Sequence, residues 1–239
     1  MTGGGPLGAS FDPDRIAALR PGRGSGPVSG SAGGGRFVAS RRTWAQAGVL
    51  TVAFLVLLYL IEAVDAMIDF SIDRAAGIEP RDIDGLDGIF FAPLLHHGWD
   101  HLIGNTLPVL ILGFLTLATG IRRGLAATAI VWVVAGVGTW LTGGAGSVHV
   151  GASSLVFGWL TYLICRGWFA RQIGQIVVGL VVLVLYGSVL WGVLPGQDGI
   201  SWQGHLFGAM GGLFAGWVLS SDERRHRRQL RTGSPVPPR

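Results

Sequence analysis

The chain has 239 residues, of which 49% are hydrophobic and only 13% are charged. A soluble globular domain is about 25% charged, so this composition, with a mean hydropathy of +0.50, indicates a membrane protein with several spans. All 18 basic residues are arginine, which excludes every mechanism that needs a lysine. The net charge of +4 comes from arginines scattered between apolar runs, a pattern that argues against a nucleic-acid partner.

The two ends of the chain differ in composition from its centre. Residues 1–42 are rich in glycine, serine and proline, and we expect a disordered cytoplasmic tail there. They contain no apolar core of the signal-peptide type, so the first hydrophobic run is expected to remain as a membrane anchor. Residues 222–239 turn from acidic to basic and then proline-rich, which predicts a second cytoplasmic tail. Residues 43–221 are expected to form the functional domain.

Six apolar runs lie between the tails. Each is long enough to cross the hydrocarbon layer of roughly 30 Å, which takes about 20 helical residues. Backbone groups in lipid must be satisfied within their own segment, so helices are the only plausible spanning form. We therefore predict an all-α membrane protein, a bundle of six transmembrane helices. The predicted spans cover residues 44–64, 102–121, 124–142, 151–169, 172–194 and 202–220.

Arginines in the short connections predict the orientation, because basic residues gather on the cytoplasmic side. Arg122 and Arg123 are expected in a tight turn after the second span, and Arg166 and Arg171 in the connection after the fourth. Both pairs fall on the same side as the arginines that flank the whole bundle. We expect a multi-pass protein of the plasma membrane with both termini cytoplasmic. The long acidic connection over residues 65–100 is then extracytoplasmic.

Polar side chains inside spans are costly, and they mark candidate functional sites. His101 and Asn105 open the second span four residues apart, which puts both on one face of a helix. Ser153 opens the fourth span and His205 the sixth. Because all three helices begin on the outer side, these four groups could share one water-accessible cavity. Taken singly, Ser153 could be packing filler, and His101 with Asn105 could be solvated or bonded to a neighbouring helix.

The helix that carries His205 is rich in glycine. Gly208 and Gly212 lie on the same face as His205, where the missing side chains let another helix approach closely. If that neighbour is the fourth span, His205 meets Ser153. A serine and a histidine suffice for acyl transfer, because the imidazole takes the hydroxyl proton and returns it to the leaving amine.

An acyl-transfer site also needs donors for the oxyanion of its intermediate. The backbone at Ser153 and the side chains of His101 and Asn105 can supply them. The alternatives lack their residues, since there is no lysine for a Ser-Lys dyad, no acidic residue near a span centre and no His-Glu-x-x-His motif for zinc. The single cysteine, Cys165, leaves no disulfide framework or thiolate metal cage to propose. We expect neither a metal nor a cofactor.

Three motifs, on the expected spans and in the expected order, resemble those of a rhomboid intramembrane serine protease of the compact six-span prokaryotic type. The resemblance covers residues 44–221. The motifs are His101-x-x-x-Asn105 in the second span, Gly151-Ala152-Ser153 followed by Phe157 in the fourth, and His205-x-x-Gly208-x-x-x-Gly212 in the sixth.

The resemblance implies a serine endopeptidase that cleaves single-span membrane proteins near the outer face of the membrane. Its implied partners are transmembrane protein substrates and the lipid bilayer, while the sequence leaves the oligomeric state open. The implied site residues are Ser153 as nucleophile, His205 as base, Phe157 stacked on the His205 ring, an oxyanion hole of His101, Asn105 and the Ser153 backbone, and His96 in a supporting role.

Two positions depart from the family pattern. Ser154 stands where rhomboids usually carry glycine after the nucleophile, and the Trp-Arg pair of the first outer loop is absent, with Arg81 and Asp82 as the nearest basic site. These departures keep open an alternative, a catalytically inactive rhomboid-like protein that binds membrane clients. A transporter that uses the intramembrane histidines would need polar groups through the full membrane thickness, yet here they stop at the outer third.

Overall fold

The computed structural model describes residues 40–196 and 199–221. Over these residues the chain is helical, and β-pairing is limited to one antiparallel bridge between Ile78 and His149. Each of the six predicted ranges is occupied by helix, which confirms the all-α architecture. The helices are α2 (Arg41–Met67), α5 (Trp99–Pro108) continued through η3 (Val109–Gly113) into α6 (Phe114–Ala118), α7 (Ile121–Thr142), α8 (Ser153–Ala170), α9 (Ile173–Tyr186) continued by η4 (Gly187–Val193), and α10 (Trp202–Leu219).

Four helical segments in the described part of the chain are long and apolar enough to cross a membrane, which confirms an all-α membrane protein. These segments are Arg41–Met67, Trp99–Ala118, Ile121–Thr142 and Ile173–Val193. The other two helices, α8 and α10, have 18 residues each and would span about 27 Å. Their polar residues and glycines make them less apolar than the four. The predicted tails lie outside the described residues, except that α2 begins at Arg41 with the Ser40 hydroxyl as its N-cap.

Two connections differ from the sequence prediction. Arg122 and Arg123 lie in the first turn of α7, and the chain reverses before them at Gly120, whose φ of +127° is a conformation that favours glycine. Arg166 lies inside α8, not in the following connection, and its side chain is buried with the guanidinium 5.6 Å from the centre of the Tyr162 ring. The helix ends instead at Arg171, which has the left-handed conformation typical of a helix end. The first predicted connection was therefore wrong by a few residues, and the second was right for Arg171 and wrong for Arg166.

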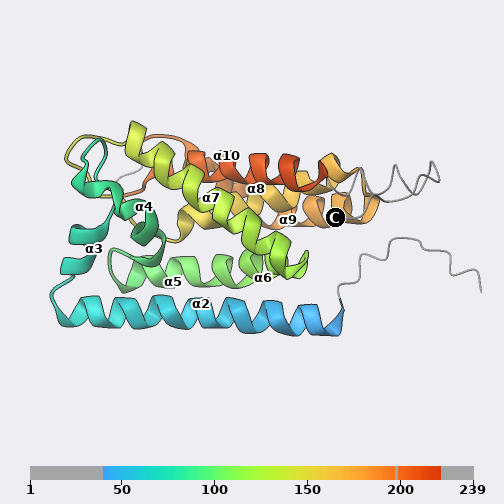
Figure 1. Ribbon diagram of the computed structural model, residues 1–239, viewed down its shortest axis with the longest axis horizontal. Helices are drawn as coiled ribbons and strands as arrows, with labels where there is room; N and C mark the ends of the chain where they lie inside the picture. Colours follow the sequence, from blue (N-terminus) through green and yellow to red (C-terminus); the bar gives the residue numbers. More distant parts are fainter. Residues whose placement is uncertain (1–39, 197–198, 222–239) are drawn as a thin grey trace, which may run out of the picture. The chain divides into compact units, whose positions relative to one another are not determined.

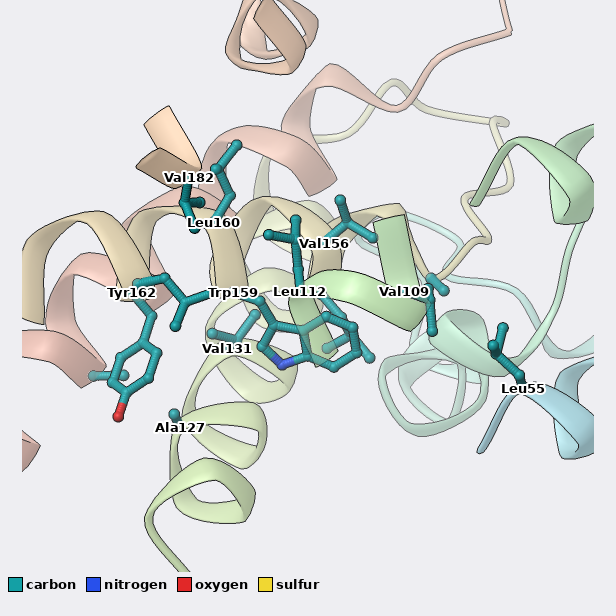
Figure 2. Packing of buried hydrophobic residues seen from close by; sticks show 14 of the residues in the cluster. Leu55, Val109, Leu112, Ala127, Val131, Val156, Trp159, Leu160, Tyr162 and Val182 are labelled. Atoms are coloured by element: carbon teal, nitrogen blue, oxygen red, sulfur yellow. The ribbon is translucent and has the colours of Figure 1, made fainter. Parts of the chain in front are cut away.

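The central helix of the bundle is α8, most of whose residues are buried. It lies among α7, α9 and α10 (Figure 1). Figure 2 shows the indole of Trp159 on α8 packed beside Val131 and Leu112. The indole N–H donates to the Thr128 hydroxyl at 2.9 Å, so the one polar atom of this ring is satisfied inside the bundle.

The helix that carries His101 near its start, α5, is not regular throughout. Pro108 has no N–H to donate to the preceding turn, and the following residues, Val109–Gly113, form a π-helical turn before α6 resumes the α-helical pattern. A Cβ added at Gly113 would lie 3.2 Å from the Trp159 ring. The widened turn therefore lies against the large ring at the centre of α8 while the polar start of α5 stays at the end of the bundle.

Glycines bring α8 and α10 into backbone contact. A Cβ added at Gly208 would overlap the carbonyl oxygen of Ser154, and one added at Gly212 would overlap that of Gly158. The close neighbour of the glycine-rich face is thus the fourth predicted span. This approach determines which end of α10 faces the start of α8.

The acidic connection over residues 68–98 gathers at the end of the bundle where α8 and α10 begin (Figure 1). It contains α3 (Ser71–Ala76), η1 (Asp84–Leu86), α4 (Gly88–Phe91) and η2 (Ala92–Leu94). It is held to the end of α7, because Arg81 donates to the Leu141 carbonyl at 3.3 Å and the Trp140 indole donates to the Asp82 carbonyl at 2.8 Å. Residues Arg81 and Asp82 therefore anchor this connection to the bundle.

Candidate active site

A cavity of about 790 Å³ opens at the end of the bundle where α5, α8 and α10 begin. Its walls come from these three helices, from η4 and from the segment that precedes α8. The four polar residues singled out at the span starts, His101, Asn105, Ser153 and His205, all line it, as does Phe157. The structure therefore brings these groups, far apart in the sequence, into one space.

Ser153 and His205 lie within hydrogen-bond distance. The Ser153 Oγ is 2.9 Å from the His205 Nε2, and the His205 Nδ1 is 2.9 Å from the carbonyl oxygen of Gly192. A carbonyl oxygen can only accept, so the neutral ring carries its proton on Nδ1 and leaves Nε2 to accept the serine hydroxyl. The ring is thus held in the tautomer that a general base needs.

The His205 ring is also fixed by its neighbours. The Phe157 ring stacks on it with centroids 4.0 Å apart and planes within 10°. Beyond its edge, a Cβ added at Gly192 would lie 2.8 Å from Phe157 and 3.1 Å from the His205 Nδ1. Glycine is therefore required at 192 for the carbonyl of η4 to approach this closely. Because a backbone carbonyl leaves no mark on side-chain patterns, sequence reasoning could not have found this acceptor.

Gly151 shapes the turn that leads into Ser153. Its φ of +122° favours glycine, and an added Cβ would lie 2.7 Å from the His101 ring and 3.5 Å from the Ser153 Oγ. Its N–H donates to the Ala92 carbonyl at 2.8 Å. The absent side chain thus leaves the space between the histidine ring and the serine hydroxyl open.

Three residues that line the cavity, His101, Asn105 and Ser153, offer hydrogen-bond donors. The His97 N–H approaches the His101 Nδ1 at 3.4 Å, which leaves the proton of the neutral ring on Nε2, the atom nearer Gly151. The Asn105 amide donates one hydrogen to the His101 carbonyl at 3.2 Å and has a second one. The first N–H groups of an α-helix have no acceptor within the helix, so the Ser153 N–H at the start of α8 is the third donor.

His96 lies behind the site and is almost completely buried. Its Nε2 accepts from the Ala152 N–H at 3.4 Å. Its ring and the His101 ring form an edge-to-face pair with centroids 5.1 Å apart. Burial, with the nearby His101 and His97 as smaller causes, lowers the pKa of His96 to about 3. A neutral ring therefore contacts the peptide that precedes Ser153.

Ser154, the departure from the family pattern, is placed away from the large cavity. Ser154 lines a second, small cavity of about 20 Å³ on the side of α7. Its backbone carbonyl packs on Gly208. The hydroxyl that contacts the His205 Nε2 belongs to Ser153.

A second polar cluster beside the cavity was missed by the sequence reasoning. His97 contacts the buried carboxylate of Asp73 at 2.5 Å. Asp73 belongs to α3, whose first N–H groups donate to the carboxylate of Asp65 at the end of α2, with Ile72 the closer at 2.7 Å. The acidic composition of residues 65–100 was noted, but no spacing pattern linked Asp73 to a histidine 24 residues later.

Comparisons with known proteins agree with the motifs. A family model described as the Rhomboid domain matches residues 85–222. An uncharacterized protein of Mycobacterium tuberculosis is 47% identical over 202 residues, which cover 81% of this chain and 84% of that protein. An uncharacterized Mycobacterium leprae protein is 44% identical over 205 residues, covering 82% and 81%. A Bacillus subtilis protein named "Putative rhomboid protease YdcA" is 29% identical over 136 residues, covering 56% and 67%. This chain belongs to the rhomboid family.

Proposed function

We propose that this protein is an intramembrane serine endopeptidase that cleaves single-span membrane proteins near the outer face of the membrane. The observation that carries the proposal is the 2.9 Å distance between the Ser153 Oγ and the His205 Nε2. This pair lies in a cavity that several polar side chains line, at one end of a bundle of apolar helices. Membership of the rhomboid family supports the same reaction class.

In the proposed reaction, the Ser153 oxygen attacks the carbonyl carbon of the scissile peptide while its proton passes to the His205 Nε2. The ring becomes positively charged, and the Gly192 carbonyl oxygen, 2.9 Å from Nδ1, faces that charge. His205 then gives its proton to the leaving amine as the C–N bond breaks. Water hydrolyses the resulting ester on Ser153 by the same sequence of proton transfers.

The tetrahedral intermediate carries a negative oxygen. The Ser153 N–H, the His101 Nε2–H and the Asn105 amide are the proposed donors to it. The residues His101, Asn105 and Ser153 all line the cavity that holds the Ser153 hydroxyl. Removing one such donor typically raises the barrier by about 2.7 to 4 kcal/mol. The stacked Phe157 ring fixes the orientation of the His205 ring. His96 accepts a hydrogen bond from the backbone just before the nucleophile.

The proposal includes a membrane arrangement. The four apolar segments and the helices α8 and α10 together make six spans of residues 43–221. Side chains that face other helices need not be apolar, as those that face lipid must be, which accounts for the polar residues on the buried faces of α8 and α10. Arginine placement puts both tails, 1–42 and 222–239, in the cytoplasm of a cell whose plasma membrane holds the protein. The cavity then opens on the extracytoplasmic side, where it meets transmembrane substrates.

Cleavage in liposomes tests the proposal. The full-length protein is reconstituted with a single-span substrate carrying a tag at each end, and the products are followed by gel and mass spectrometry. Wild-type protein should cut the substrate. Ser153→Ala and His205→Ala should each lower the rate by about 10⁴-fold or more, and the matched Ser154→Ala control should keep it. A folded wild-type protein that binds substrates of this class without cutting them would instead identify the inactive, client-binding form.

A further inference from the structure

His149 is a titratable residue outside the proposed dyad, in the segment that leads from α7 to α8. Its backbone forms both hydrogen bonds of the bridge with Ile78, each with an N to O distance of 3.0 Å. This bridge ties the segment before α8 to the acidic connection over residues 68–98. The backbone of His149 is thereby fixed, and its side chain points toward a third segment.

Both ring nitrogens of His149 contact serine hydroxyls. The Nε2 is 2.9 Å from the Ser147 Oγ, and the Nδ1 is 2.8 Å from the Ser201 Oγ. Ser147 donates its own hydrogen to the Gly144 carbonyl at 2.6 Å, so it accepts from the His149 Nε2–H. The Nδ1 of the neutral ring is then the acceptor for the Ser201 hydroxyl.

Ser201 is the N-cap of α10, the helix that carries His205. Its Oγ accepts from the Gly204 N–H at 3.3 Å while its hydrogen is directed to His149. His149 lies four residues before Ser153, and Ser201 lies four residues before His205. The same two segments that meet at the Ser153–His205 contact are thus joined a second time, at the positions four residues earlier.

We propose that His149 is a positioning residue for the Ser153–His205 pair, acting through its hydrogen bond to Ser201 to hold the start of α10 against the segment that leads into α8. The proposal rests on the proposed function. His149 also lines the large cavity, as Ser147 and Ser201 do.

The surroundings of His149 favour the neutral ring that this arrangement needs. Burial, and then the nearby charge of His97, lower its pKa below the usual value. The ring fits beside Gly143, where an added Cβ would lie 2.8 Å from the His149 Nε2 and would overlap Pro80. The ring is therefore packed in one position, between the end of α7, the acidic connection and the start of α10.

Two amide variants, each of which keeps a polar atom near one ring nitrogen, separate this role from simple filling of space. His149→Asn keeps a polar atom where Nδ1 lies and so keeps the contact with Ser201. His149→Gln keeps one where Nε2 lies and so keeps the contact with Ser147. The readout is the second-order rate at which a fluorophosphonate labels Ser153 in the full-length protein in detergent micelles. We expect Asn to label within about threefold of wild type, and Gln to label about tenfold to a hundredfold more slowly, as a displacement of about 1 Å at a reacting pair would do.

A double-mutant cycle gives the second arm. Ser201→Ala should slow labelling by a similar factor, and combining it with His149→Gln should add little, because both remove one contact. Ser147→Ala is the matched control, and it should label at close to the wild-type rate. The thermal unfolding midpoint, measured on each variant, identifies any variant that fails to fold.

The outcomes are distinguishable. Equal labelling rates for the Asn and Gln variants, in protein that is folded, would overturn the positioning role while leaving the proposed function intact. Full additivity of His149→Gln with Ser201→Ala would also overturn it. If folded wild-type protein is not labelled at all, the proposed function fails and the positioning role fails with it.

Discussion

The two helices that follow α8 in the chain and pack against it, α9 and α10, contact it in different ways. α10 meets α8 through backbone contacts at glycines such as Gly208 and Gly212. α9 instead has mostly apolar, largely exposed side chains, among them Ile173 at 80% and Val184 at 77% exposure. In a membrane, the outer face of α9 is therefore a lipid-facing surface, whereas half of the residues of α10 are buried in the bundle and its exposed apolar face, which includes Phe214 and Trp217, is smaller.

Different elements therefore position different groups of the candidate site. The glycine contacts fix the distance between α8 and α10, and this distance sets the position of Ser153 relative to His205. The acceptor that selects the His205 tautomer comes from η4, the continuation of the peripheral α9. Substitutions should thus be severe on the α8–α10 face, intermediate around the His205 ring and mild on the outer face of α9.

The largest effect is expected for Gly208→Ala. The new Cβ would overlap the carbonyl oxygen of Ser154, so the two helices must separate, and overpacking of this kind costs about 1–3 kcal/mol or more. Substrate cleavage should be lost, and the thermal unfolding midpoint should fall. Gly174→Ala is the matched control on α9, because nothing lies within 4 Å of its added Cβ. Similar behaviour of the two variants would contradict the proposed importance of the α8–α10 contact.

A smaller effect is expected for Phe157→Leu, which removes the ring stacked on His205. Aromatic pairs contribute about 0.5–1.5 kcal/mol beyond their buried area, so cleavage should slow by up to about tenfold. Phe54→Leu is the control, since Phe54 packs edge-on against Trp159 and does not line the cavity. Unchanged cleavage by Phe157→Leu in folded protein would show that the stack does not orient the base.

His96 predicts a dependence of stability on pH. Its pKa is about 3 in the folded protein, against 6.5 for the unperturbed side chain, so the unfolded chain takes up this proton first as the pH falls. The stability it contributes is complete above pH 6.5 and is lost progressively toward pH 3. His96→Gln, which keeps an acceptor near the Nε2 position, should reduce the fall of the unfolding midpoint between pH 7 and pH 4. An identical slope for the variant and the wild type would contradict this assignment.

The smallest effect is expected for Val184→Ala on the outer face of α9. This side chain is largely exposed, and such substitutions usually change stability by less than about 0.5 kcal/mol. Val182→Ala on the buried face of the same helix is the matched comparison, and it should cost about 2 kcal/mol. Unfolding in detergent measures both, and equal losses would show that α9 does not have one packed and one lipid-facing side.

Much of the fold follows from physical constraints that act along the sequence. Long apolar runs must be helical in lipid, and a helix occupies each predicted range. The convergence of His101, Asn105, Ser153 and His205 also had a local signal, because polar side chains at the same ends of neighbouring apolar runs lie at one depth. Gly208 and Gly212 indicated the face on which α10 meets a neighbour.

The remaining features depend on tertiary contacts that leave no periodic signal. The Gly192 acceptor is a backbone carbonyl, which every residue has. Arg166 was placed in a connection because arginine is charged, yet a long side chain inside α8 can pack its guanidinium on the Tyr162 ring. The contact of His149 with Ser201 depends on how two outer segments pack, although its spacing, four residues before each member of the pair, is visible once the contact is known.

The central claim is that Ser153 is a nucleophile activated by His205. Reaction of the folded, full-length protein with a fluorophosphonate, followed by mass spectrometry of the modified peptide, tests it most directly. The account predicts one modified residue, Ser153, with labelling lost in His205→Ala and retained in Ser154→Ala. Modification at Ser154, or labelling of Ser153 that is undiminished in His205→Ala, would contradict it.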